Sequence, residues 1–178
     1  MRQLRRLAAD FRALHGRVTD VSYTPGTDAL HRIGPLLLGA QALTATALTR
    51  LKALDNSPYT SIAGSRASLQ LMASVVSSSA LASTDLAHVL LANPYAGRDF
   101  AGYPAASPAI ERTRHAEAIP QMTGHLADAA HQLDLCATAC LYLASGITDD
   151  YTTASEPKAP TTAAAKTQAV PAAQGGRR

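Results

Sequence analysis

Apolar residues that recur at alternating steps of three and four are the feature that most constrains this fold. In the first helical segment, expected over Arg2–Ser22, five apolar residues follow this spacing: Leu4, Leu7, Phe11, Leu14 and Val18. Near the other end, over Gln121–Ser145, the same spacing runs through Met122, Leu126, Ala129, Leu133, Cys136, Cys140 and Leu143. This periodicity places one apolar seam on each helix and predicts helices that pack side by side.

Composition agrees with helices and disfavours a sheet. The 178 residues include no Trp, two Phe and six Tyr, and Leu and Ala carry much of the apolar content. Strands favour β-branched and aromatic residues, whereas Ala and Leu have high helix propensity. A chain of this length can bury one core without disulfide staples. We therefore expect an all-α, antiparallel four-helix bundle over residues 1–150.

Glycine and proline set the expected boundaries between the helices. Pro25-Gly26 predicts the first turn, and a second helix is expected over Asp28–Leu54 with Asp28 as its cap. Gly34-Pro35 should kink that helix or delay its start. A third helix is expected over Ser57–Asn93, because Ser57 can cap it, Pro58 fits its first position and Pro94 stops it.

The fourth helix is expected to begin at Ser107-Pro108 and to be split near Pro120, with its end at Gly146. Residues 151–178 are rich in Ala, Thr and Pro and have little to bury, which predicts a disordered tail. The irregular connection over residues 94–108 contains Tyr95, Arg98, Phe100 and Tyr103. Because aromatic residues and Arg are enriched at binding hot spots, these four are candidate partner-binding residues; the alternative is that they cover one end of the bundle.

Charge is unevenly distributed along the chain. Residues 1–54 carry a net charge of about +5, residues 55–150 about −5 and the remaining residues about +3. One interpretation is that a basic first hairpin packs beside an acidic second hairpin. The other is that the first helix presents five arginines to nucleic acid or to an acidic protein: Arg2, Arg5, Arg6, Arg12 and Arg17. No helix-turn-helix pattern supports sequence-specific reading of DNA.

Cys136 and Cys140 lie four residues apart, so both thiols share a helix face and could bind one soft metal ion. His88 is the additional ligand that we would nominate. Both cysteines also continue the apolar seam, however, and free cysteine packs well as a small hydrophobe. Core packing is therefore the favoured interpretation, and no metal or cofactor is expected. The other histidines form no recognisable motif: His125 and His131 lie six residues apart, on different faces of a helix.

The motifs of common enzyme classes are absent from the sequence. H-E-x-x-H, G-x-S-x-G, G-x-G-x-x-G and the phosphate-binding P-loop do not occur. We expect a non-enzymatic interaction or assembly protein that self-associates through apolar helix faces. The alternatives are a nucleic-acid-binding accessory protein and a metal-binding bundle. No segment is recognised as a signal peptide or a membrane span, so the expected location is the cytoplasm, and the Arg and Ala bias suggests a bacterial source.

Overall fold

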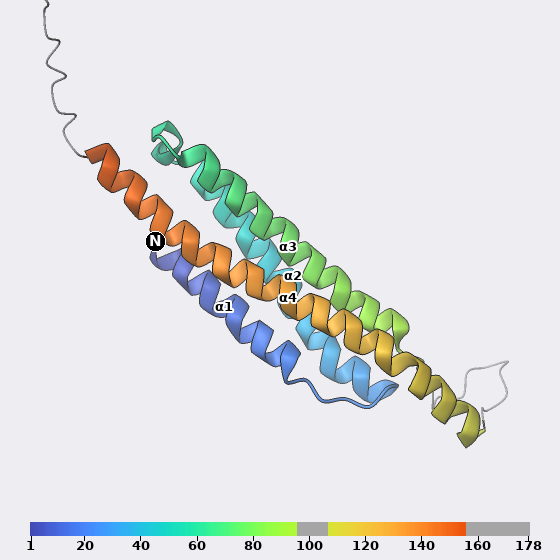
Figure 1. The fold of residues 1–178 in the computed structure, drawn as a ribbon. Coiled ribbons are helices and arrows are strands. Elements are labelled where there is room, and N and C mark those ends of the chain that lie inside the picture. The colour runs from blue at the N-terminus through green and yellow to red at the C-terminus, as the bar shows by residue number, and fades with distance from the viewer. Residues whose placement is uncertain (96–106, 156–178) are drawn as a thin grey trace, which may run out of the picture.

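Four long helices run side by side with alternating directions in the computed structural model (Figure 1). The structure describes residues 1–95 and 107–155. The helices are α1 (Arg2–Thr19), α2 (Thr27–Asp55), α3 (Ser65–Ala92) and α4 (Pro108–Ser155), and a short 3₁₀ helix, η1 (Pro58–Ser61), precedes α3. The predicted all-α antiparallel bundle is confirmed. Each helix packs on the next in the chain, and α4 closes the bundle by packing on α1.

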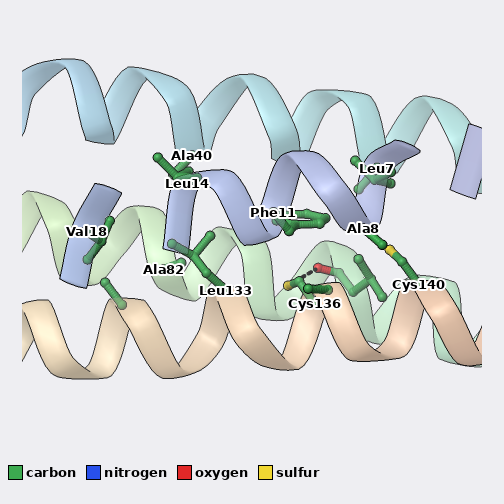
Figure 2. Packing of buried hydrophobic residues seen from close by; sticks show 14 of the residues in the cluster. Leu7, Ala8, Phe11, Leu14, Val18, Ala40, Ala82, Leu133, Cys136 and Cys140 are labelled. Carbon is green, nitrogen blue, oxygen red and sulfur yellow. Dashed lines mark hydrogen bonds between the residues drawn. The ribbon is translucent and has the colours of Figure 1, made fainter. Parts of the chain in front are cut away.

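The core is formed where the seams meet, as Figure 2 shows for residues from all four helices. The apolar residues predicted for the first helix are all buried, and so are those predicted for the last. Many of the remaining core positions are alanines: Ala29, Ala40, Ala47, Ala82, Ala129, Ala137 and Ala144. Helix α1 contacts α4 far more than it contacts α2. The packing of its apolar seam against α4 is therefore the main interaction that holds α1 in place.

The expected split of the fourth helix at Pro120 is wrong, and so is the expected delay of the second helix's start to Pro35. Helix α2 continues through Pro35, and α4 continues through Pro120 rather than being split there. A proline inside a helix removes the hydrogen bond to the carbonyl four residues earlier. Here His31 and Ala116 carry those carbonyls, and both residues and both prolines are exposed. Water can therefore satisfy the carbonyls that the two prolines leave free.

Other boundaries also differ from the prediction. Helix α1 ends at Thr19 rather than Ser22. The third predicted helix is broken: Ser57 does cap a helix, but it is the short η1, and α3 begins only after Gly64, whose φ of 93° is left-handed. Helix α4 continues past Gly146 to Ser155, so residues 151–155 of the expected tail are helical. The rest of that tail, residues 156–178, lies outside the described residues.

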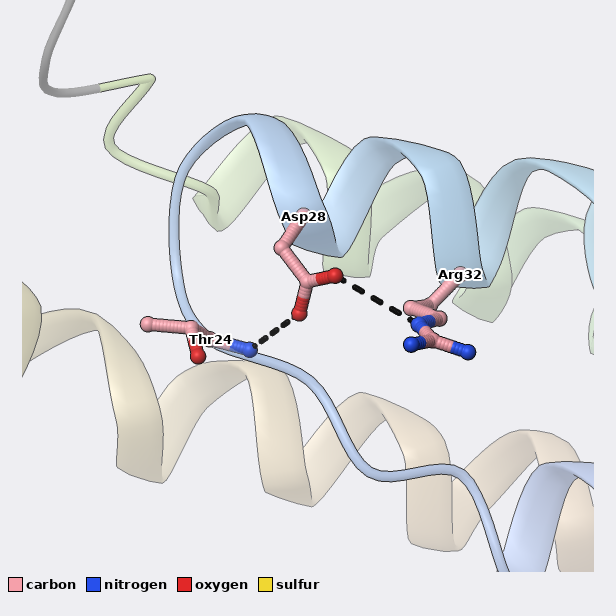
Figure 3. A network of polar contacts seen from close by, with 3 residues as sticks. All are labelled: Thr24, Asp28 and Arg32. Atoms are coloured by element: carbon pink, nitrogen blue, oxygen red, sulfur yellow. Dashed lines mark hydrogen bonds and ion pairs between the residues drawn. The ribbon is translucent and has the colours of Figure 1, made fainter.

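Asp28 lies within the first turn of α2 and is not its cap (Figure 3). Its carboxylate accepts a hydrogen bond from the backbone N–H of Thr24 at 2.8 Å and pairs with Arg32 at 3.4 Å. The Thr24 hydrogen bond and the Arg32 charge hold the pKa of Asp28 below its ordinary value. A carboxylate at this position also interacts favourably with the positive end of the helix dipole.

Two polar contacts join distant segments at opposite ends of the bundle. At one end, the buried Asn93 side chain accepts from the backbone N–H of Gly26 at 2.6 Å and donates to its carbonyl at 2.8 Å. At the other end, the buried Tyr59 hydroxyl donates to the Asp150 carboxylate and lies 2.8 Å from the Ser68 hydroxyl. A side chain at Gly64 would collide with Asp150, since an added Cβ would lie 2.5 Å from its Oδ1.

Candidate functional site: the outer surface of helices α3 and α4

A second stripe with three-four spacing lies beside the buried seam on both α3 and α4. On α3 it comprises Leu71, Ser74, Ser78, Leu81, Asp85 and His88, and on α4 it comprises His125, Asp128, Gln132, Leu135, Ala139 and Tyr142. None of these twelve residues is fully buried. We call the two stripes together the α3–α4 strip.

The two halves of this strip face one another across the antiparallel helix pair. His88 and His125 are in contact, with ring centroids 5.1 Å apart, and Asp85 senses the charge of Asp128. These pairs fix the register, because residue numbers on antiparallel helices run in opposite directions. It follows that Leu71 lies near the level of Tyr142 and Ser78 near the level of Leu135. One end of the strip is therefore polar, and the rest is mostly apolar.

The apolar part of the strip contains large hydrophobic side chains exposed to solvent. Leu81 is 50% exposed, Leu135 is 43% exposed and Tyr142 is 70% exposed. Leu91, on the outermost face of α3, is 78% exposed. The formal charges of α3 are limited to Arg66 and Asp85. Isolated exposed leucines are ordinary, but several on a helix with so few charges indicate a contact surface.

Helix α3 also has the length and apolar composition of helices that cross membranes, although sequence reasoning rejected a membrane span because of its polar residues. Only 28% of its most apolar 18-residue window is buried in the bundle. The core helix of a water-soluble protein that meets this criterion is mostly buried, whereas most of this window is left uncovered by the rest of the described chain.

The polar end of the strip brings together three side chains that can bind a metal. The carboxylate of Asp85 and the imidazoles of His88 and His125 offer ligand atoms that all lie within 4.8 Å of one another. Burial raises the pKa of Asp85 above its ordinary value, and the nearby negative charge of Asp128 raises it further. The sequence pattern pairs His88 with the cysteines and leaves His125 without a partner, so this cluster is not predicted from the sequence.

The cysteines lie elsewhere in the bundle. Cys136 and Cys140 are both fully buried, and the Cys136 thiol lies 3.5 Å from the carbonyl oxygen of Val75, to which it donates (Figure 2). Burial raises the pKa of each thiol to about 12. Cys136 is eleven residues beyond His125, about 16 Å along the helix. His88, which contacts His125, therefore lies beside His125 and Asp85 and not beside the cysteines. This environment is that of two core thiols.

The five arginines predicted as a binding surface lie on the solvent side of α1. Arg2, Arg5, Arg6, Arg12 and Arg17 are all exposed. Within residues 1–95 and 107–155, the ion pair present joins Arg32 and Asp28, so none of the five is paired with an acidic side chain there. The basic first hairpin does pack beside the acidic second hairpin, α1 on α4 and α2 on α3, but the five arginines form no ion pairs across this contact in the described residues.

Of the four residues predicted as a loop docking site, the structure describes Tyr95. Its hydroxyl donates to the Leu90 carbonyl at 2.9 Å, its φ is 47° and its side chain is 39% exposed. Arg98, Phe100 and Tyr103 lie outside the described residues.

A surface hollow lies beside the connection between α1 and α2. Arg17, Asp20, Asp28 and Arg32 line it, together with Tyr23. Its two arginines are matched by two aspartates, and the closer pair is already joined in an ion pair. The hollow therefore has no excess charge with which to select an ionic ligand.

Comparison of the chain with protein-family models, with curated proteins and with solved structures finds no match.

Proposed function

We propose that this chain is a non-enzymatic assembly protein that self-associates through the α3–α4 strip. The observation that carries the proposal is the uncovered apolar surface of α3, which bears exposed leucines and two formal charges along 28 residues. The centres of protein interfaces are depleted of charged residues in the same way.

A second copy of the chain is the partner that fits this surface. Two copies related by a twofold axis would place the same strip against itself, since a twofold interface uses one patch on both subunits. The three-four spacing of the strip repeats the spacing of the buried seams, and this spacing lets side chains of one helix pair fill the gaps between those of another. The contact would cover Leu71, Leu81, Leu135 and Tyr142, which the single chain leaves exposed.

Leu81→Glu tests the proposal, because it places an unpaired charge at the centre of the expected contact. A buried charge without a partner costs about 3 kcal/mol or more, and the dimer would contain two, so self-association should weaken by well over about a hundredfold. Sedimentation velocity across a wide concentration range measures this. Ile119→Glu is the matched control: Ile119 is 46% exposed and lies one turn before Thr123, on the flank of α4 that faces α1 and Tyr23.

The wild type and Ile119→Glu should associate alike, while Leu81→Glu should sediment as a monomer. A wild type that remains monomeric at every concentration would refute the proposal, and so would equal association of both variants. Flotation of the chain with lipid vesicles, abolished by Leu81→Glu, would assign the surface to a bilayer instead of a second copy.

We propose nucleic-acid binding by α1 as a second candidate, because its five exposed arginines have no acidic partner among the described residues. They lie opposite the apolar seam, so α1 can stay docked while its outer face contacts phosphates. Each phosphate contact adds about one to the slope of log affinity against log salt concentration.

Replacing Arg2, Arg5, Arg6 and Arg12 with alanine should therefore reduce the slope by roughly four and weaken binding to random-sequence DNA. Fluorescence anisotropy at several salt concentrations measures this. The control replaces Arg112 and Arg114, which are exposed on α4, and should leave both quantities nearly unchanged. Wild-type binding that is absent or insensitive to salt would exclude this candidate.

A further inference from the structure

The polar end of the α3–α4 strip has the composition of a metal site. Two imidazole nitrogens and one carboxylate oxygen come from Asp85, His88 and His125, with ligand atoms within 4.8 Å of one another. We propose that these three residues bind a divalent transition-metal ion, and that Zn²⁺ is the ion that suits them best. One chain supplies all three ligands, so metal binding does not require self-association.

The two helices hold the three side chains at this spacing. Asp85 and His88 are three residues apart on α3, so they lie on one face, and the adjacent residues Leu86 and Val89 are fully buried. On α4, His125 is followed by Leu126, which is buried against the core. The packing of these buried neighbours against the core fixes the backbone at each of the three ligands. Metal binding would therefore not have to order a loop.

The electrostatic surroundings favour a cation. Partial burial raises the pKa of Asp85 above its ordinary value, and repulsion by the Asp128 carboxylate raises it further. A divalent cation would relieve that repulsion, and Asp128, one turn from His125, would add its negative charge to the site.

The ligand types favour zinc over the alkaline-earth ions. Imidazole suits Zn²⁺ and its neighbours, whereas Mg²⁺ and Ca²⁺ are bound mainly by oxygen. With bonds of about 2.0–2.1 Å, tetrahedral ligand atoms lie roughly 3.3–3.4 Å apart. The observed spacing must therefore close by up to about 1.5 Å. Rotations of the three side chains, none of which is fully buried, can provide this movement. Three protein ligands leave a coordination position open to solvent.

Calorimetric titration with Zn²⁺ tests the site, using the full chain prepared without a polyhistidine tag. The wild type should bind one ion per chain. His88→Ala and Asp85→Asn should each weaken binding at least tenfold, since even changes outside the ligand shell of known sites cost about 10- to 100-fold. Both substitutions are at partly or fully exposed positions, and circular dichroism checks that the helices are retained.

Two controls separate this site from other ligands. His131→Ala removes an exposed histidine on another face of α4 and should leave Zn²⁺ affinity unchanged. Titration with Co²⁺ should give ligand-field bands without a thiolate charge-transfer band, because the cysteines take no part. Equal affinity in the wild type and His88→Ala would overturn the proposal. So would a thiolate band that disappears in a Cys136→Ala variant, since it would place the ion at the cysteines.

Discussion

Replacing Phe11 with alanine is expected to lower the free energy of unfolding by about 3–5 kcal/mol, the usual cost of removing a buried phenyl ring. Phe11 has no exposed surface and sits at the centre of the α1 seam, on the side of α1 that faces α4 (Figure 2). Because α1 contacts α2 only slightly, little else holds it in place. Urea unfolding followed by circular dichroism measures the change.

Arg12→Ala provides the matched control on the neighbouring residue. Arg12 is exposed, so its replacement should change stability by less than about 0.5 kcal/mol. In a domain of this size the Phe11→Ala variant should also melt roughly 6–20 °C lower than the wild type. A loss below about 1 kcal/mol would show that α1 is not docked on the core as the structure has it.

Alkaline pH is expected to destabilise the fold through its two buried thiols. Burial raises the pKa of Cys136 and of Cys140 from an ordinary value of 9.0 to about 12. Between these values the unfolded chain loses two protons that the folded chain keeps. Stability is therefore fully present below pH 9 and falls as pH rises toward 12, by up to about 2.7 kcal/mol per pH unit. Urea unfolding at a series of pH values from neutral to about 11 measures this.

The double variant Cys136→Ala, Cys140→Ala isolates the thiol contribution. It should be less stable at neutral pH, because it leaves two small cavities, but its stability should change little just above pH 9. A shallower decline should remain at higher pH, because burial and Asp150 also raise the pKa of Tyr59. Equal pH dependence in the variant and the wild type would show that the thiols are not the groups that titrate.

Local sequence rules predicted the fold because each seam is a property of one helix. Spacing alone identified every buried residue of α1 except Ala8, and most of those of α4. The same rules failed at Pro35 and Pro120, because the consequence of a proline depends on whether the carbonyl one turn earlier faces water or the core. That information belongs to the assembled bundle and is not contained in the local sequence.

The cluster at the polar end of the strip was missed for a related reason. Sequence reasoning compared His125 with His131 on the same helix and did not compare it with His88 on another. A usable signal was nevertheless present. Asp85 and His88 read D-x-x-H, whereas His125 and Asp128 read H-x-x-D in the opposite order. Two such motifs on antiparallel neighbouring helices face each other when the register is right, but the register itself could not be deduced from the spacing.

The hydrogen bonds between Asn93 and Gly26 and between Tyr59 and Asp150 bear on a problem of repetitive apolar seams, which is that they allow more than one axial alignment of the helices. Helices whose contacts repeat every seven residues can slide past each other by one repeat, about 10 Å, and still bury similar side chains. Hydrogen bonds between segments 67 and 91 residues apart cannot be re-formed after such a slide. Because these two hydrogen-bonded contacts lie at opposite ends of the bundle, they select a single axial alignment of the helices that they join.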